Sequence, residues 1–173
     1  CLTRENRNIS GNGCVGGIAG FNLSGAVLEA NENRANVTAA GNYAGGIAGA
    51  NSGNILTASG SQAQEDSDAI TISGDAGEGI GGIAGWNKNT GNISVYAGAD
   101  ETKAEPEVVA IGSNVTVSGR EKVGGIVGIN EGTLDTSQND GSIRFLVCKA
   151  KLVHATDDYA GGIIGEAKAG NGE

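Results

Sequence analysis

A single histidine, His154, and three cysteines, Cys1, Cys14 and Cys148, are the first residues of the sequence to consider for zinc or nucleophilic chemistry. A zinc peptidase needs a helix with the pattern His-Glu-x-x-His. One histidine cannot supply that pattern, so this chemistry is excluded for the chain. No local spacing indicates a Ser-His-Asp triad, although triads are assembled in space. We predict that His154 is an ordinary surface residue of the strand-like run 152–155.

The cysteine spacing fits no zinc pattern. A disulfide between Cys1 and Cys14 would leave Cys148 as a free thiol in the apolar run 145–148, where we expect it to be buried. Lipid modification of Cys1, as in bacterial lipoproteins, is a second alternative. In a third alternative, Cys1 has no role of its own and is only the point at which a longer chain was divided. All three alternatives stay open.

Carboxylates gather in two polar inserts of the sequence. They are Glu65, Asp66 and Asp68 in one insert and Asp100, Glu101, Glu105 and Glu107 in the other. Solvated loops explain such acids without any site. A calcium site drawn from Asp66, Asp68, Asp100 and Glu101 is the functional alternative, because hard oxygen ligands converge from loops of this kind; Asp157 with Asp158 is another candidate. Neither insert matches the twelve-residue calcium loop, and we expect no catalytic residue and no cofactor other than this calcium.

These residues are set among five copies of a glycine-rich phrase, Gly-Gly-Ile-Ala-Gly or a close variant. Successive copies are 29, 36, 43 and 37 residues apart, and four of them are followed by an asparagine. Recurring units at such intervals are typical of stacked repeat folds. A phosphate loop is excluded, because the Gly-Lys-Ser/Thr ending is missing. The repeat positions are Gly17, Ile18 and Asn22; Gly46, Ile47 and Asn51; Gly82, Ile83 and Asn87; Gly125, Ile126 and Asn130; and Gly162 and Ile163.

Short strands surround each phrase, and no segment has an apolar period of 3.6 residues. Alternation in runs such as 70–73 and 115–118 indicates strands with one buried face. We predict three strands per repeat: one before the phrase, the phrase itself, and one after the following glycine. Such strands bury their apolar faces only if successive repeats stack, so we predict an all-β fold, a parallel β-solenoid or β-helix with loop insertions.

The stacking assigns a role to each repeated position. We expect one interior ladder of Ile18, Ile47, Ile83, Ile126 and Ile163, and a second of Val27, Ile55, Ile93 and Leu134. The asparagines would occupy one corner, each amide bonding the like residue one repeat away. The position after the phrase is mixed: Phe21 and Trp86 are candidate ligand contacts there, although we favour the interpretation of a variable, partly exposed position.

Composition and charge bound the partners. We expect one elongated domain over 1–173, with repeats near 16–44, 45–80, 81–123, 124–160 and 161–173, as a fragment of a longer protein. The net charge of −9 argues against nucleic acid and against an anionic membrane surface, and no apolar run is long enough to span a membrane. Uncapped solenoid ends favour end-to-end self-association, which this charge opposes and salt promotes.

The run 123–134, Val-Gly-Gly-Ile-Val-Gly-Ile-Asn-Glu-Gly-Thr-Leu, resembles the GLUG repeat of bacterial surface and secreted proteins. The resemblance covers all five repeats, and the fifth departs from it with Glu166-Ala167 in place of the asparagine. It implies an extracellular location, at the bacterial cell surface or secreted, and supplies no catalytic residue. We therefore expect a non-enzymatic, adhesin-like stalk or binding spacer that contacts host protein or glycan. The alternatives are an accessory repeat segment of a secreted peptidase and a β-helical carbohydrate-active enzyme.

Overall fold

A computed structural model describes residues 1–4, 7–29, 31–57, 69–95, 107–135 and 145–169. The described chain is all-β, as the sequence predicts, and contains strands but no helix. Every strand pairing in it is parallel. Parallel neighbours need a long connection between them, and here the rest of one repeat supplies that connection.

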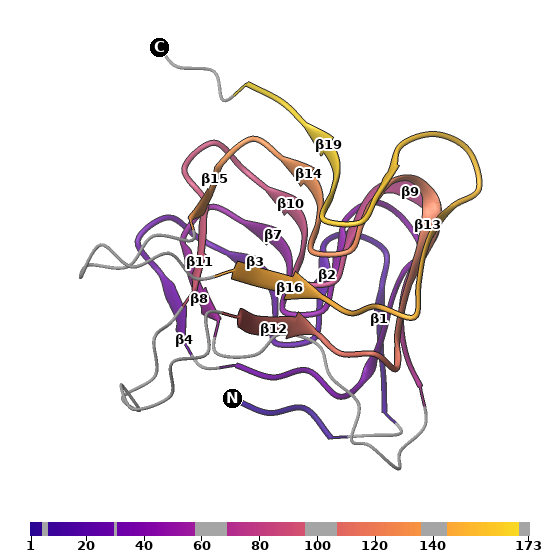
Figure 1. The fold of residues 1–173 in the computed structure, drawn as a ribbon, viewed down its shortest axis with the longest axis horizontal. Helices are drawn as coiled ribbons and strands as arrows, with labels where there is room; N and C mark the ends of the chain where they lie inside the picture. Colours follow the sequence, from indigo (N-terminus) through magenta and orange to yellow (C-terminus); the bar gives the residue numbers. More distant parts are fainter. Residues whose placement is uncertain (5–6, 30, 58–68, 96–106, 136–144, 170–173) are drawn as a thin grey trace.

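The strands form four sheets that surround a common core (Figure 1). The first sheet holds β1 (Asn8–Gly11), β2 (Val15–Gly16), β5 (Asn36–Ala39), β6 (Ala44–Gly45), β9 (Ile70–Gly81), β13 (Val115–Gly124), β17 (Leu152–Ala155) and β18 (Ala160–Gly161). The second holds β3 (Ala19–Asn22), β7 (Ala48–Asn51), β10 (Ala84–Asn87), β14 (Val127–Asn130) and β19 (Ile164–Ala167). The third holds β4 (Val27–Glu29), β8 (Asn54–Thr57), β11 (Asn92–Val95) and β15 (Thr133–Asp135). The fourth holds β12 (Glu107–Ile111) and β16 (Phe145–Cys148).

Strands from equivalent places in successive repeats lie side by side. In the first sheet the order is β1-β5-β9-β13-β17, and in the second it is β3-β7-β10-β14-β19. The register keeps equivalent residues together, since Ile9 pairs with Val37, Val37 with Ile72, Ile72 with Val117, and Val117 with Val153. The apolar side chains of this column thus point to the same side in every repeat.

The glycine phrase is a bend, so the prediction that it forms a strand of its own is wrong. Its first glycine ends one strand, the second glycine and the isoleucine turn the chain, and the following residue begins the next strand. A Cβ on Gly45 would overlap the carbonyl oxygen of Ala48 across this bend, and the same holds at Gly81 with Ala84 and at Gly124 with Val127. Close backbone approach therefore requires these glycines.

The core contains most of the predicted ladders. Ile47, Ile83 and Ile126 have no exposed surface, whereas Ile18 is only partly buried and Ile163 is 40% exposed. Ile163 lies in β19's repeat at the edge of the pairing order, so it has a neighbouring repeat on one side only. Burial of each isoleucine in this ladder contributes roughly 1.5–3 kcal/mol.

Val27 does not belong to the second ladder. Val27 is 52% exposed, and it is Leu28 that pairs with Ile55 and packs against the core. The turn after Asn22 explains the shift. The Ala26 N–H donates to the Leu23 carbonyl, just as the Gly91 N–H donates to the Lys88 carbonyl in a later repeat. Ala26 therefore takes the place of the repeated glycine. A shift of one residue moves a strand's side chains to its other face.

The predicted asparagine corner is confirmed. The Nδ2 of Asn22 donates to the Oδ1 of Asn51, Asn51 donates in the same way to Asn87, and Asn87 to Asn130, each over 2.8 Å. Asn22, Asn51 and Asn87 are buried. Without this asparagine ladder each buried amide would lack a hydrogen-bond partner, which costs about 1–3 kcal/mol.

Candidate functional site

Two rows of outward positions lie next to each other beside the second sheet. The pairing of β3, β7, β10, β14 and β19 aligns the first row, which we call the aromatic row: Phe21, Ala50, Trp86, Ile129 and Glu166. The second row stands two residues before each of the last four phrases. We call it the left-handed row, and it comprises Tyr43, Gly79, Lys122 and Tyr159, all of which have positive φ.

The left-handed row is a repeated backbone feature. Its φ angles are 66° at Tyr43, 78° at Gly79, 56° at Lys122 and 63° at Tyr159. A residue with a side chain in this region costs roughly 1–2 kcal/mol relative to ordinary backbone, so the surrounding fold must hold it there. The Tyr43 N–H and the Lys122 N–H do so by bonding the carbonyls of Glu78 and Asp158 in the next repeat.

Tyr43 and Trp86 join the two rows. Their ring centroids lie 4.9 Å apart at an interplanar angle of 35°, and a Cβ on Gly79 would come within 2.7 Å of Cδ1 of Tyr43. The missing side chain at Gly79 therefore makes room for the Tyr43 ring, which in turn supports Trp86. Such an aromatic pair contributes about 0.5–1.5 kcal/mol beyond its buried area.

Lys88 covers the aromatic row. Its Nζ lies 4.5 Å from the Trp86 ring centroid and 5.5 Å from that of Phe21. The register places Ala50 between the two aromatic positions, and its small side chain leaves room for one cation to reach both rings. Phe21 is 40% exposed, so this contact is worth about 0.5–1 kcal/mol, as at exposed sites.

The indole nitrogen of Trp86 has no acceptor. The Nε1 atom is buried, yet no hydrogen-bond partner for it lies in the described chain. An indole N–H is a donor only, and leaving it unpaired costs about 1–3 kcal/mol. An aromatic face, a cation and an unpaired donor in one place are the groups that hold a flat, hydroxyl-bearing or carbonyl-bearing ligand.

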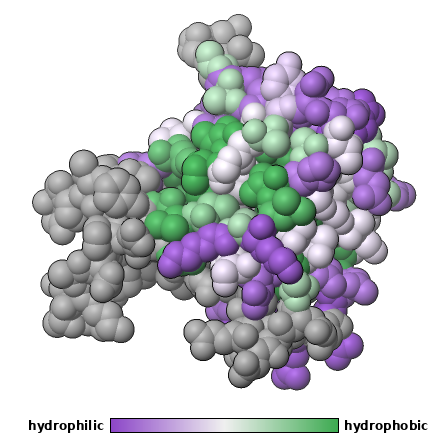
Figure 2. All heavy atoms as spheres, turned by 45° about the vertical axis from the view of Figure 1, so that its right-hand side comes forward, coloured by the Kyte–Doolittle hydropathy of each residue, from purple (hydrophilic) through white to green (hydrophobic). Residues whose placement is uncertain are grey.

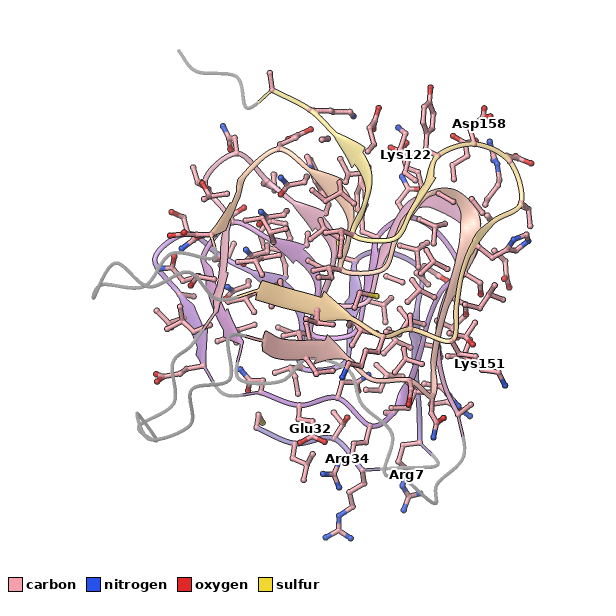
Figure 3. The ribbon with its side chains drawn as sticks, in the orientation of Figure 1. Arg7, Glu32, Arg34, Lys122, Lys151 and Asp158 are labelled. Carbon is pink, nitrogen blue, oxygen red and sulfur yellow. The ribbon has the colours of Figure 1, made fainter. Side chains whose placement is uncertain are left out.

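The far end of both rows carries ion pairs in place of aromatics. Lys122 contacts Glu78 and lies 3.3 Å from Oε2 of Glu166, which also lies 3.2 Å from Nζ of Lys168. The hydrogen bond that Lys122 donates to the Glu78 carboxylate is the main cause that raises the pKa of Lys122. Desolvation opposes ionisation of Glu166, but Lys168 and Lys122 outweigh it and hold the pKa of that carboxyl below its usual value. Figure 3 places Lys122 and Asp158 at one edge of the molecule, opposite Arg7, Glu32 and Arg34.

The calcium candidates Asp66, Asp68, Asp100 and Glu101 lie outside the described residues. Within those residues, no group of three or more His, Cys, Asp or Glu side chains is placed to hold a metal ion. Asp157, named with Asp158 as another candidate, forms an ion pair with Arg120, Nε to Oδ2 3.1 Å.

His154 is exposed, as predicted. All three cysteines are free thiols: Cys1 is exposed, and Cys14 and Cys148 are half-buried. The Cys1–Cys14 disulfide is therefore not formed in this structure, and Cys148 is less buried than we expected. Burial raises the pKa of both the Cys14 and the Cys148 thiol, so both are protonated at neutral pH.

Sequence reasoning selected Phe21 and Trp86 but missed Tyr43 and Lys88, which the fold brings to them. The available signal was positional, because Tyr43 and Tyr159 both stand two residues before a phrase. Their left-handed backbone gave no signal, since tyrosine is not a residue that favours positive φ.

No protein-family model, no curated protein and no solved structure matches the chain. Among the described residues there is no helix with the length and apolar character that crossing a membrane requires.

Proposed function

We propose that the chain is a non-enzymatic, extracellular β-solenoid module of a bacterial surface protein, an adhesin-like stalk or binding spacer. In this proposal each of the five repeats is one coil of the solenoid. The observation that carries it is the asparagine ladder, in which side chains 29, 36 and 43 residues apart bond one another over the same distance. Equivalent side chains meet in this way when each repeat advances the chain by one strand spacing. The likeness to the GLUG repeat supports the bacterial surface location.

A spacer needs a length that grows with repeat number. Neighbouring strands lie about 4.8 Å apart, so each added coil extends the module by that amount while its cross-section stays the same. Such a fold has only nearest-neighbour contacts between coils. Its length is therefore set by the number of repeats, which suits a structure that holds another domain away from a surface.

The first experiment duplicates residues 45–123 between Val123 and Gly124. The copied segment contains two whole repeats and rejoins the chain at equivalent positions, before a phrase. Small-angle scattering is expected to show a particle about 10 Å longer along one axis, with an unchanged cross-sectional radius. A particle that widens instead, or that scatters as two separate bodies, would overturn the solenoid spacer.

The aromatic row is the binding surface in this proposal. Phe21 is exposed, Trp86 is partly exposed, and Lys88 covers both rings on a flexible side chain. A sugar ring, or a flat side chain of a host protein, would stack on these rings. If Lys88 moves aside, an acceptor on the same ligand reaches the unpaired Nε1 of Trp86.

The second experiment screens the chain on glycan and host-protein arrays. Binding by the original chain is expected to weaken at least tenfold in Phe21→Ala and Trp86→Ala and to persist in Val27→Ala. Val27 is the matched control, because it is an exposed apolar residue on another sheet. Equal loss in all three variants would remove the aromatic row from the proposal. Turnover of a polysaccharide by the purified chain would favour the carbohydrate-active enzyme.

A further inference from the structure

The bend in each phrase has a direction. Gly17 and Ile18 donate their N–H groups to the carbonyls of Gly45 and Ile47 at 3.2 and 3.0 Å, and Ala19 also donates to Ile47, at 3.0 Å. The later bends repeat this pattern in whole or in part: Ile47 and Ala48 donate to Ile83, Ile83 and Ala84 to Ile126, and Ile126 and Val127 to Ile163. The first four bends thus present consecutive donors toward the later repeat. The carbonyls that accept them come in pairs at three bends, Gly45 with Ile47, Gly81 with Ile83 and Gly161 with Ile163, while at the fourth bend Ile126 accepts.

The last bend keeps its donors free. The equivalent N–H groups belong to Gly162, Ile163 and Ile164, and within the described chain they have no acceptor. A Cβ on Gly162 would meet nothing within 4 Å, whereas one on Gly125 would meet the Gly162 carbonyl. Among the described residues the donors therefore meet no neighbour, at the edge that carries β17 and β19, which we call the late end.

The first bend keeps its acceptors free in the same way. Its carbonyls belong to Gly16 and Ile18, and in the part of the chain that the structure describes they accept no bond. They face the opposite edge, which carries β1, β3 and β4 and which we call the early end. The two ends are therefore complementary in hydrogen bonding, donors on one and acceptors on the other.

Both ends also expose apolar side chains of the core columns. At the late end Ile163 is 40% exposed and Val153 is half-buried, and at the early end Ile9 and Ile18 are only partly buried against the core. Ile163 occupies the same column as Ile18, and Val153 the same column as Ile9. Figure 2 shows apolar residues gathered in the middle of one face of the molecule, bordered by polar ones.

We propose that two copies of this chain stack head to tail, with the late end of one on the early end of the next. The N–H groups of Gly162, Ile163 and Ile164 donate to the carbonyls of Gly16 and Ile18 of the next copy, as Ile126 and Val127 donate to Ile163 within one chain. Ile163 packs on the next copy's Ile18. We take a second copy as the partner at the late end because its early end offers the same carbonyls and the same apolar column. Equivalent groups pair in this way at the four junctions between repeats within one chain.

One feature weakens this junction and provides a test. The asparagine ladder runs from Asn22 to Asn130, each Nδ2 donating toward the later repeat, and position 167, aligned with Asn130, is alanine. In the described residues the Oδ1 of Asn22 accepts no bond. At the junction that atom faces Ala167 and stays unpaired, whereas an asparagine at 167 would donate to it.

The proposal is tested by sedimentation of the full chain over a range of concentrations at raised salt, which screens the net charge of −9. Because a head-to-tail dimer keeps one free end of each kind, we expect a concentration-dependent series of dimers and longer oligomers, which Ile163→Asp abolishes. Leu152→Asp is the matched control, because it adds the same charge to an exposed apolar residue of a late-end strand. We expect Ala167→Asn to tighten the dimer about fivefold, the equivalent of about 1 kcal/mol for one hydrogen bond.

Mixing two blocked variants tests the direction of stacking. Ile163→Asp blocks the late end and Ile18→Asp blocks the early end, so each variant alone is expected to stay monomeric. An equimolar mixture is expected to form a 1:1 dimer, because each variant retains the end that the other lacks. Circular dichroism melts first establish that both variants are folded; if Ile18→Asp is not folded, it is replaced by the milder block Ile18→Ser.

Three results would overturn the proposal. They are a wild-type chain that stays monomeric at every concentration and salt, a Leu152→Asp variant as impaired as Ile163→Asp, and a mixture of the two folded blocked variants that fails to form dimers.

Discussion

Asn51 donates a hydrogen bond from its Nδ2 to the Oδ1 of Asn87 over 2.8 Å, and neither side chain has exposed surface. Because Asn51 also accepts from Asn22 at the same distance, its amide is used as donor and acceptor at once. An amide carries a donor and an acceptor on one short side chain without a charge. The ladder therefore requires the amide itself and not merely a polar residue.

The first prediction concerns this requirement. Asn51→Asp keeps the shape and the acceptor but loses the donor, so a carboxylate oxygen would face the Asn87 Oδ1 in a buried place. We expect a loss of about 3–5 kcal/mol in the free energy of unfolding, as for an uncompensated buried charge, measured by urea denaturation. Asn8→Ala is the control, because its hydrogen bond with Asn36 is exposed; its effect should stay within about 0.5 kcal/mol.

The second prediction compares one position of the phrase in two repeats. A Cβ on Gly125 would overlap the Gly162 carbonyl and lie 2.5 Å from Sγ of Cys148, whereas a Cβ on Gly162 would meet nothing. Gly125→Ala is therefore expected to destabilise by more than about 3 kcal/mol, in the range of severe overpacking. Gly162→Ala should be neutral or stabilise by up to about 1 kcal/mol through the unfolded chain. Thermal melts at low concentration measure both, and equal losses would contradict the crowding argument.

The third prediction separates the inside of the fold from its outer row. Ile83 has no exposed surface, while Trp86 is partly exposed. We expect Ile83→Ala to cost about 2–5 kcal/mol, as large-to-small core changes do, and Trp86→Ala to cost clearly less. Denaturant melts of both variants decide this. A larger loss for Trp86 would mean that the aromatic row holds the fold together and is not primarily a contact surface.

The sequence was informative where a residue type repeats in register. The isoleucine after each pair of glycines predicted the buried ladder at Ile47, Ile83 and Ile126, and the asparagines predicted their corner. Strand order followed from the same repetition, because equivalent strands pair. These features depend on which residues recur, and recurrence is visible in a single chain.

Features that depend on local geometry were not predictable in this way. The turn after Asn22 places Ala26 where other repeats have glycine, which exchanged Val27 for Leu28 in the core. The bend in the phrase follows from backbone contacts across it, and glycine alone is also compatible with a strand or a turn. The contact of Tyr43 with Trp86 joins residues 43 positions apart, and no spacing in the sequence predicts this contact.

The fourth prediction concerns pH. Glu166 has a lowered pKa in the fold, so its contribution to stability is present above its unfolded pKa and is lost as pH falls through the folded value. Lys122 has a raised pKa, so its contribution is present below its unfolded pKa and is lost as pH rises through the folded value. The ion-pair cluster therefore stabilises fully between about pH 5 and pH 10.

Lys122→Asn tests this window, because asparagine removes the charge and still tolerates the left-handed backbone. The difference in unfolding free energy between wild type and variant should be largest near pH 7 and should shrink below about pH 4. Urea melts at several pH values measure it. Arg7→Asn, which removes an exposed cation, is the control and should show no such profile.

The fifth prediction uses the left-handed row. Tyr159 has a φ of 63° and a 58% exposed side chain, so its ring contributes little to offset its backbone conformation. Tyr159→Gly is expected to be neutral or to stabilise by up to about 1 kcal/mol, because glycine adopts positive φ without the Cβ clash. Tyr43 has nearly the same φ, 66°, but its ring contacts Trp86 and fills the space over Gly79. Tyr43→Gly should therefore destabilise by about 2–4 kcal/mol despite the same backbone relief. Thermal melts of the two variants measure the contrast, and opposite signs are expected; a loss of similar size in both would mean that strain in this row is not relieved by glycine.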